Sequence, residues 1–453
     1  MGQSVKSNEM VKDLTQGSVP RLLFVFAAPL FVSNALQAIY NVVDMVVVGQ
    51  VIGGNGMSAV STGGNILHIL TFLAMGFSTA GQVIIARAVG SGDMDGVKKC
   101  IGSLFTIMFG MAIGVSILCF AFRYQLLNLV NTPKEAFDYT MDYTIICVIG
   151  LVFIYGYNIV SAIMRGMGDS KRPFIFVALA AILNTVLDII FVAFLGWEVM
   201  GAALATVIGQ GFSFIYAISY LYRNREQFSF DFKLHSFIPD KDASGKIVAL
   251  GIPMALQSAA VTVSQTFVAA WVNSFGVIPS ATAGILGKLN LMAGIMSSSI
   301  TTAASSMVGQ NLGAKKYDRV PKIMTCAFIG ALIFAGSLAL VIYAIPNPIF
   351  ALFTSDAAVL AYATIIVGPI VLNYLGAASR TFGFSIINGS GNSKLNLFVA
   401  IFDGMIGRIG IAYVLGFVAG LGPLGFWYGD ALAGFMPFII GGTYYLTGNW
   451  KKI

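Results

Sequence analysis

Four polar side chains lie inside otherwise apolar stretches of the sequence and form a set that can bind a small cation. Asp44 lies in IYNVVDMVVVG, Asn184 and Asp188 lie in ILNTVLDIIFVAF, and Thr206 lies in GAALATVIGQG. A spacing of four residues puts Asn184 and Asp188 on one helix face, about a turn apart. Two carboxylates with an amide and a hydroxyl offer only oxygen ligands, which suit Na+, and close carboxylates also favour uptake of a proton. The set therefore predicts a coupling-ion site for Na+ or H+.

A structural alternative exists for the same residues. Asp44 and Asp188 can cap or hydrogen-bond neighbouring helices, with Asn184 and Thr206 as ordinary packing residues. Ionisable groups inside a membrane are costly and commonly mark ion or substrate pathways, which favours the functional interpretation.

The C-terminal half carries a different set of charges. Asp403 and Arg408 are five residues apart, and we expect a salt bridge or an interior network there, because opposite charges at depth usually pair. Asp430 stays ambiguous. Lys288 and Arg380 are expected near the ends of spans, where long basic side chains reach toward water.

Flexible methionine and aromatic side chains suit a pocket for hydrophobic cations. The residues that we expect to line a central substrate cavity are Tyr40, Tyr157, Met254, Gln257, Met292 and Met296.

The composition places all of these residues in a membrane protein. Hydrophobic residues make up 57% of the 453 residues and charged residues 10%, against roughly a quarter charged in soluble domains. The mean hydropathy is +0.85. The apolar runs are long enough for helices of about 20 residues, as a bilayer requires. We therefore predict an all-α integral membrane protein with twelve transmembrane helices, at about 20–48, 56–86, 99–122, 138–164, 173–195, 200–222, 247–275, 280–308, 322–345, 357–387, 395–418 and 424–447.

Lysine and arginine orient these spans. They gather in the loops after the even-numbered spans and at the two ends, as Lys6, Lys12, Lys451 and Lys452. Basic residues mark the cytoplasmic side, so both termini are predicted to be cytoplasmic in a multi-pass protein of the bacterial inner membrane. The net charge of +7 then reflects topology and predicts no nucleic-acid partner.

The two halves of the chain repeat one another. RGMGDSK at 165–171 matches NGSGNSK at 388–394, and Pro29 matches Pro253. The sequence predicts two six-helix bundles related by a pseudo-twofold axis: an N-lobe at 1–224, a cytoplasmic linker at 225–246 and a C-lobe at 247–453. Such repeats suit alternating access. In the repeated loop, the glycines permit a tight turn and the lysine anchors the loop at an anionic membrane surface.

Together these features resemble the MATE (multidrug and toxic compound extrusion) family, in particular its prokaryotic DinF-like and MepA-like branches. The resemblance covers essentially the whole chain and implies an antiporter, not an enzyme. Na+ or H+ would enter at Asp44, Asn184, Asp188 and Thr206 while an organic, mostly cationic compound leaves. It implies no cofactor besides the coupling ion, and we expect a monomer.

Other functions remain as alternatives. A lipid-linked saccharide flippase shares the architecture of the larger superfamily, but it would be expected to carry more basic residues in its cavity. An intramembrane enzyme acting on prenyl diphosphates would need aspartate-rich Mg2+ motifs, which the sequence lacks. A channel fits the twofold repeat less well. The sequence contains no GxxxxGK[ST] nucleotide-binding motif, so an ion gradient is the visible energy source.

Overall fold

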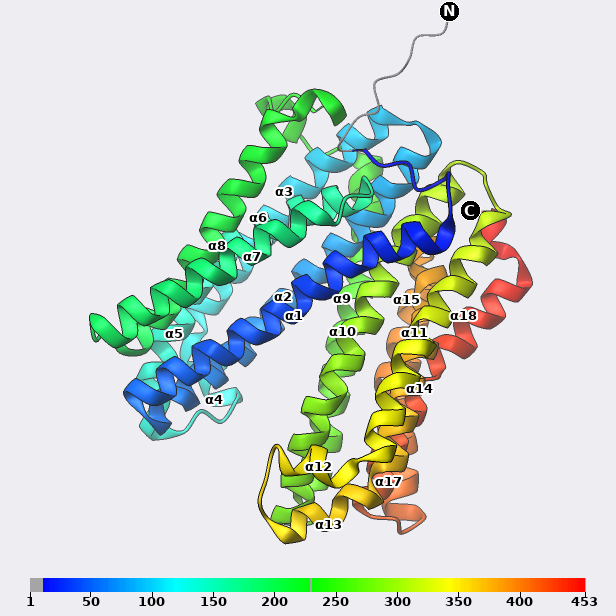
Figure 1. The fold of residues 1–453 in the computed structure, drawn as a ribbon. Coiled ribbons are helices and arrows are strands. Elements are labelled where there is room, and N and C mark those ends of the chain that lie inside the picture. Colours follow the sequence, from blue (N-terminus) through cyan, green and yellow to red (C-terminus); the bar gives the residue numbers. More distant parts are fainter. Residues whose placement is uncertain (1–10, 229, 453) are drawn as a thin grey trace, which may run out of the picture. The chain divides into compact units, whose positions relative to one another are not determined.

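All the regular secondary structure in the part of the chain that the structure describes is helical. The computed structural model describes residues 11–228 and 230–452 (Figure 1), so Lys6 lies outside the described residues. Among the described residues, eleven helices are long and apolar enough to cross a membrane, and a bent pair, Lys134–Ile149 with Leu151–Gly166, makes a twelfth span. The predicted fold class is confirmed.

The chain divides into two compact units. One comprises Val32–Gly251 with the described residues up to Asp13, and the other comprises Leu14–Phe31 with the chain from Ile252 onward. The division therefore falls inside two continuous helices, α1 (Val19–Ile52) and α9 (Lys241–Asn273). The lobe boundaries drawn from the sequence stay a prediction.

The unit that contains Val32–Gly251 is built around α2 and α8. Helix α2 packs against α3, α5 and α6, and α8 packs against α5, α6 and α7. Large apolar side chains such as Ile101, Leu104 and Tyr155 fill the space between these helices and are fully buried. The elements are α2 (Gly54–Ser91), α3 (Met94–Ala121), α4 (Arg123–Leu129), η1 (Lys134–Ala136), α5 (Phe137–Ile149), α6 (Leu151–Gly166), α7 (Lys171–Asp188), the π-helical η2 (Ile189–Phe194), α8 (Glu198–Arg223), η3 (Arg225–Phe228) and η4 (Leu234–Phe237).

The unit that begins again at Ile252 is built around α14. This helix packs against α10, α11, α17 and α18, as α6 packs against α2, α3 and α8 in the other unit. The elements are α10 (Val277–Gly313), α11 (Arg319–Ala344), α12 (Pro346–Ala351), α13 (Ala357–Ile365), α14 (Val367–Gly389), α15 (Ser393–Val399), the π-helical η5 (Ala400–Gly407), α16 (Arg408–Tyr413), the π-helical η6 (Val414–Val418), α17 (Pro423–Ala433), α18 (Met436–Thr447) and η7 (Asn449–Lys452).

Two spans differ from their predicted outlines. The run predicted at 138–164 bends by 46° at Gly150. The run predicted at 357–387 is interrupted at Ile366, where α13 ends and α14 begins. Pro369 follows three residues later and lies in the first turn of α14, where a missing backbone N–H costs no hydrogen bond. Both breaks lie within continuous apolar sequence, which explains why composition did not reveal them.

The repeated loops form the predicted tight turns. Gly168 and Gly391 have φ values of +86° and +69°, a left-handed conformation that glycine adopts without strain. Asp169 Oδ1 then accepts a hydrogen bond from Lys171 N at 3.0 Å, and Asn392 Oδ1 accepts one from Leu395 N at 3.1 Å. The Asp/Asn side chain of the motif therefore accepts a first-turn N–H of the following helix: Asn392 as the N-cap residue of α15, and Asp169 from the residue before Ser170, the N-cap of α7.

Two basic side chains also form ion pairs with Asp169. Lys12 Nζ lies 3.1 Å from its Oδ1 and Arg172 Nη1 lies 3.0 Å from its Oδ2, while Asp169 itself is fully buried. We expect Asp169→Ala to lower the stability of this unit by about 1–2 kcal/mol, because charged hydrogen bonds and a helix cap are lost together. Asp169→Asn should lose less, since the amide keeps the cap. Apparent Tm values of the purified protein in detergent test this order, and an Asp169→Ala variant as stable as the wild type would contradict it.

The segment that joins α8 to α9 is packed against α3. Asp240 N donates to Ser103 Oγ at 3.0 Å, and Asp240 Oδ2 lies 3.7 Å from Lys99 Nζ. Phe237 makes edge contacts with the rings of Phe105 and Phe230. A hydrogen bond from the Ser236 hydroxyl lowers the pKa of Asp231 below its usual value. This segment is therefore held to the unit that precedes it.

Candidate functional site

The structure brings the four predicted cation-binding residues together inside one unit. Asn184 and Asp188 lie in the last two turns of α7, just before the π-helical η2, while Asp44 lies on α1 and Thr206 on α8. All four side chains are buried, and Asp188 is fully so. Three helices thus converge on a single polar cluster in apolar surroundings, and π-helical turns often occur at functional sites.

The contacts within the cluster are loose. Thr206 Oγ1 donates to Asp44 Oδ2 at 3.4 Å. The Asn184 amide meets its neighbours best with Nδ2 donating to Asp44 Oδ1 and with Oδ1 accepting from Thr206 N, both at 3.3 Å. These separations exceed the usual ranges of about 2.7–3.2 Å for an N–H···O bond and about 2.5–3.0 Å for an O–H···O bond. The Asn184 amide and the Thr206 hydroxyl therefore both donate to the Asp44 carboxylate, through long hydrogen bonds.

The two acids face each other. The carboxyl groups of Asp44 and Asp188 lie within hydrogen-bonding reach of each other, and a hydrogen bond between them needs a proton on one, since two carboxylates offer only acceptors. The other oxygen of Asp188, Oδ1, is buried and has no hydrogen-bond partner among the described residues. The cluster has too many acceptors for its donors, and a proton or a small cation with oxygen ligands would correct that shortage.

Two tyrosines border the cluster and were not anticipated as part of it. Tyr143 on α5 is buried and hydrogen-bonds with Thr206. Tyr40 on α1, predicted as a substrate contact, lies near Asp44 and hydrogen-bonds with Gln37 and Gln210. Tyr143 escaped the sequence analysis because it belongs to the bent span, whose path the apolar pattern does not define.

The predicted substrate residues fall in both units. Tyr157 lies close to Tyr40 and its hydroxyl donates to Pro173 O at 3.4 Å. In the other unit, Met254 is buried and Met292 is exposed. Gln257 and Met296 are half-buried there, and Met296 lines a cavity of about 10 Å³ between α10, α11 and α14, which holds about one water molecule. The role of these six residues as substrate contacts stays a prediction.

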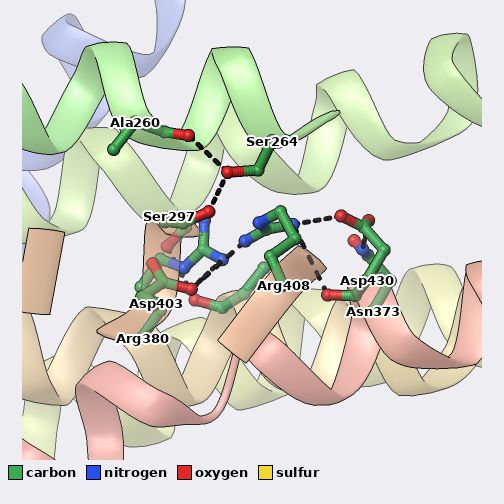
Figure 2. A network of polar contacts seen from close by, with 10 residues as sticks. Ala260, Ser264, Ser297, Asn373, Arg380, Asp403, Arg408 and Asp430 are labelled. Atoms are coloured by element: carbon green, nitrogen blue, oxygen red, sulfur yellow. Dashed lines mark hydrogen bonds and ion pairs between the residues drawn. The ribbon is translucent and has the colours of Figure 1, made fainter. Parts of the chain in front are cut away.

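The charged residues of the C-terminal half form a buried network (Figure 2). Arg408 Nη2 lies 3.2 Å from Asp403 Oδ1, so the predicted pairing of these residues is confirmed. Asp430 belongs to the same network through its contact with Arg408. The expectation for Arg380 was wrong: it lies in the middle of α14, with Nη2 3.7 Å from Asp403 Oδ1, where the buried carboxylate is a partner for its charge.

Taken together, twelve spans, two matching halves and buried acids within the spans define a polytopic helical membrane transporter. The model of the MatE family matches this chain over residues 29–190 and again over 253–414. The chain belongs to the MatE family.

Relatives and solved structures agree with this assignment. The chain is 31% identical over 313 residues to the probable multidrug resistance protein YpnP of Bacillus subtilis, covering 68% of each chain. It is 25% identical over 440 residues to the probable multidrug resistance protein YoeA of the same organism, covering 96% of this chain and 95% of YoeA. An outward-facing structure of a multidrug resistance MATE family transporter of the MOP superfamily matches with a TM-score of 0.90 at 21% identity, covering 98% and 99% of the two chains. The chain is thus a transporter, not an enzyme.

Proposed function

We propose that this chain is an antiporter that exports organic, mostly cationic compounds in exchange for Na+ or H+ by alternating access. The observation that carries the proposal is the contact between the buried carboxyls of Asp44 and Asp188, with Asp188 Oδ1 left without a partner among the described residues. The names of YpnP and YoeA as probable multidrug resistance proteins support the export of drug-like compounds.

The chemistry of the exchange follows from charge. With the site empty of protons and metal ions, two carboxylates place negative charge inside an apolar bundle, which attracts an organic cation. When Na+ or H+ enters, the side chains of Asp44 and Asp188 are neutralised. For Na+, the Thr206 hydroxyl adds a further oxygen ligand, and the Asn184 oxygen adds another once its amide turns toward the ion. The attraction for the organic cation is then lost. The same acids thus bind either cargo or coupling ion, and the two cannot be held equally well at once.

The location of the protein belongs to the same proposal. The lysines and arginines of the even-numbered loops favour a multi-pass protein of the bacterial inner membrane with both termini in the cytoplasm. Export then runs from the cytoplasm outward, with ions entering down their gradient. The transporter acts as a monomer in this proposal, because each chain contains both repeats that alternating access needs.

The test is efflux from proteoliposomes loaded with a fluorescent organic cation such as ethidium. We expect efflux to start when an inward gradient of Na+ or of H+ is imposed, and to stop when an ionophore collapses that gradient. Comparing the two gradients separately identifies the coupling ion. Efflux at the same rate with neither gradient would contradict an antiport mechanism.

A further inference from the structure

The buried network of the C-terminal half is balanced in charge. Asp403 and Arg408 are both at most 1% exposed, and Asp430 contacts the other end of the Arg408 guanidinium. Asn373 Nδ2 approaches Asp430 Oδ2 at 3.4 Å, and Arg380 adds a second positive charge beside Asp403 (Figure 2). Two acids are thus matched by two guanidinium groups. The two acids of the other unit, in contrast, form no ion pair with a basic side chain of the described residues.

The repeat shows which residues of the two units correspond. Gly168 and Gly391, both with positive φ, are 223 residues apart, whereas Gly196 and Gly420, also with positive φ, are 224 apart. One residue has therefore been gained between 391 and 420 relative to the first half. The additional π-helical segment η5 (Ala400–Gly407) lies in this interval, and a π-helical turn is how a helix accommodates one extra residue.

Beyond η5 the offset of 224 pairs Asn184 with Arg408 and Thr206 with Asp430. Contacts support this register, because Asn184–Thr206 and Arg408–Asp430 are both separated by 22 residues and both join the fifth span of their half to the sixth. The close contacts of the glycines near the start of the sixth span of each half support the same offset. A Cβ on Gly201 would touch Phe191, and one on Gly425 would touch Leu415, again 224 residues further on.

We propose that the Arg408 guanidinium is a tethered cation in the place where the first half would bind its exchangeable one. This inference rests on the proposed function, in which Asn184 and Thr206 contribute ligands to the coupling ion. In the second half, the counterpart of Asn184 carries its own positive charge and reaches Asp403 and Asp430 at once. The unit therefore has no vacancy for a mobile ion, and Arg408 limits the transporter to one coupling-ion site per chain.

Removing the tethered charge should create a second site. In Arg408→Asn, two acids remain beside Arg380 alone, and Asp403 Oδ2, which has no partner among the described residues, becomes an available ligand. The experiment counts cations bound to purified protein in detergent: radiolabelled Na+ at equilibrium, and protons by potentiometric titration in the absence of Na+. We expect one cation for the wild type, two for Arg408→Asn, and one for the neutral control Arg408→Asn/Asp430→Asn.

The outcomes separate this inference from the proposed function. An Arg408→Asn protein that binds no more Na+ and no more protons than the wild type overturns the inference. A wild type that binds nothing, with Arg408→Asn binding one ion, contradicts the proposed site in the first half while supporting the tethered cation.

A second variant keeps the test decisive if Arg408→Asn does not fold. Asp403→Asn in the otherwise unchanged chain should leave the number of bound cations as it is, since the carboxylate serves only Arg408 and Arg380. Loss of a bound ion in Asp403→Asn would show that the second half holds an exchangeable cation and would overturn the inference.

Discussion

Asp188→Asn is expected to reduce gradient-driven efflux by at least tenfold while the protein still inserts and folds. The asparagine keeps the shape of the side chain but removes one of the two buried negative charges on which ion exchange depends. A factor of ten corresponds to about 1.4 kcal/mol, a small fraction of what a buried charge contributes to binding a cation. The measurement is the initial rate of ethidium efflux from proteoliposomes under an imposed Na+ or H+ gradient.

The apparent Tm of the same variant decides between coupling and structure. The asparagine amide of Asp188→Asn can donate to Asp44 in place of the proton that the two carboxyls would share, so the Tm should stay unchanged. A structural role for the acids predicts a lower Tm instead. Asp242→Asn, which changes an exposed acid at the start of α9, is the matched control and should pump normally. Normal pumping by Asp188→Asn and by Asp44→Asn would contradict the proposed coupling site.

Gly383→Ala is expected to destabilise the C-terminal unit by about 3 kcal/mol, toward the upper end of overpacking effects. Helices α14 and α18 cross so closely that a Cβ on Gly383 would lie 1.8 Å from Pro437 O, and a Cβ on Gly441 would lie 2.4 Å from the Cα of Gly383. Backbone atoms cannot turn aside as a flexible side chain can, so the helices would have to move apart. A reduced apparent Tm and a lower yield of monodisperse protein are the measurements.

The neighbouring glycine gives the control for that prediction. A Cβ on Gly442 would meet no atom within 4 Å, so Gly442→Ala should match the wild type and can gain slightly from the higher helix propensity of alanine. Equal stability of Gly383→Ala and Gly442→Ala would show that the contact between α14 and α18 is not needed for folding.

The sequence was sufficient to predict the spans and their buried polar residues, because one physical constraint dominates both. The cost of exposing polar groups to lipid fixes long apolar helices, and their number and approximate bounds follow from composition alone. The same cost made Asp44, Asn184 and Asp188 conspicuous, and the structure places them in contact. Their role in ion coupling is a question for the transport assay and stays a prediction.

The sequence was insufficient to predict where a span breaks and which side chains meet across helices, because several helix paths are equally apolar. The bend at Gly150 and the break at Ile366 both lie within continuous apolar sequence, and the apolar pattern marks neither of them. Arg380 was expected near water because its partner, Asp403, lies 23 residues away on another helix. Tyr143 was missed for a related reason, because its contact with Thr206 depends on how α5 packs against α8.

The extra residue of η5 suggests a route by which the two repeated halves of the chain could come to differ in ion binding. Insertion of a single codon into the segment around Asp403 is enough to account for the shift from an offset of 223 to one of 224. The widened turn absorbs the insertion locally, so the helices on either side keep their partners. Gene duplication followed by such a small change would let one half specialise while the other retained its ancestral duty.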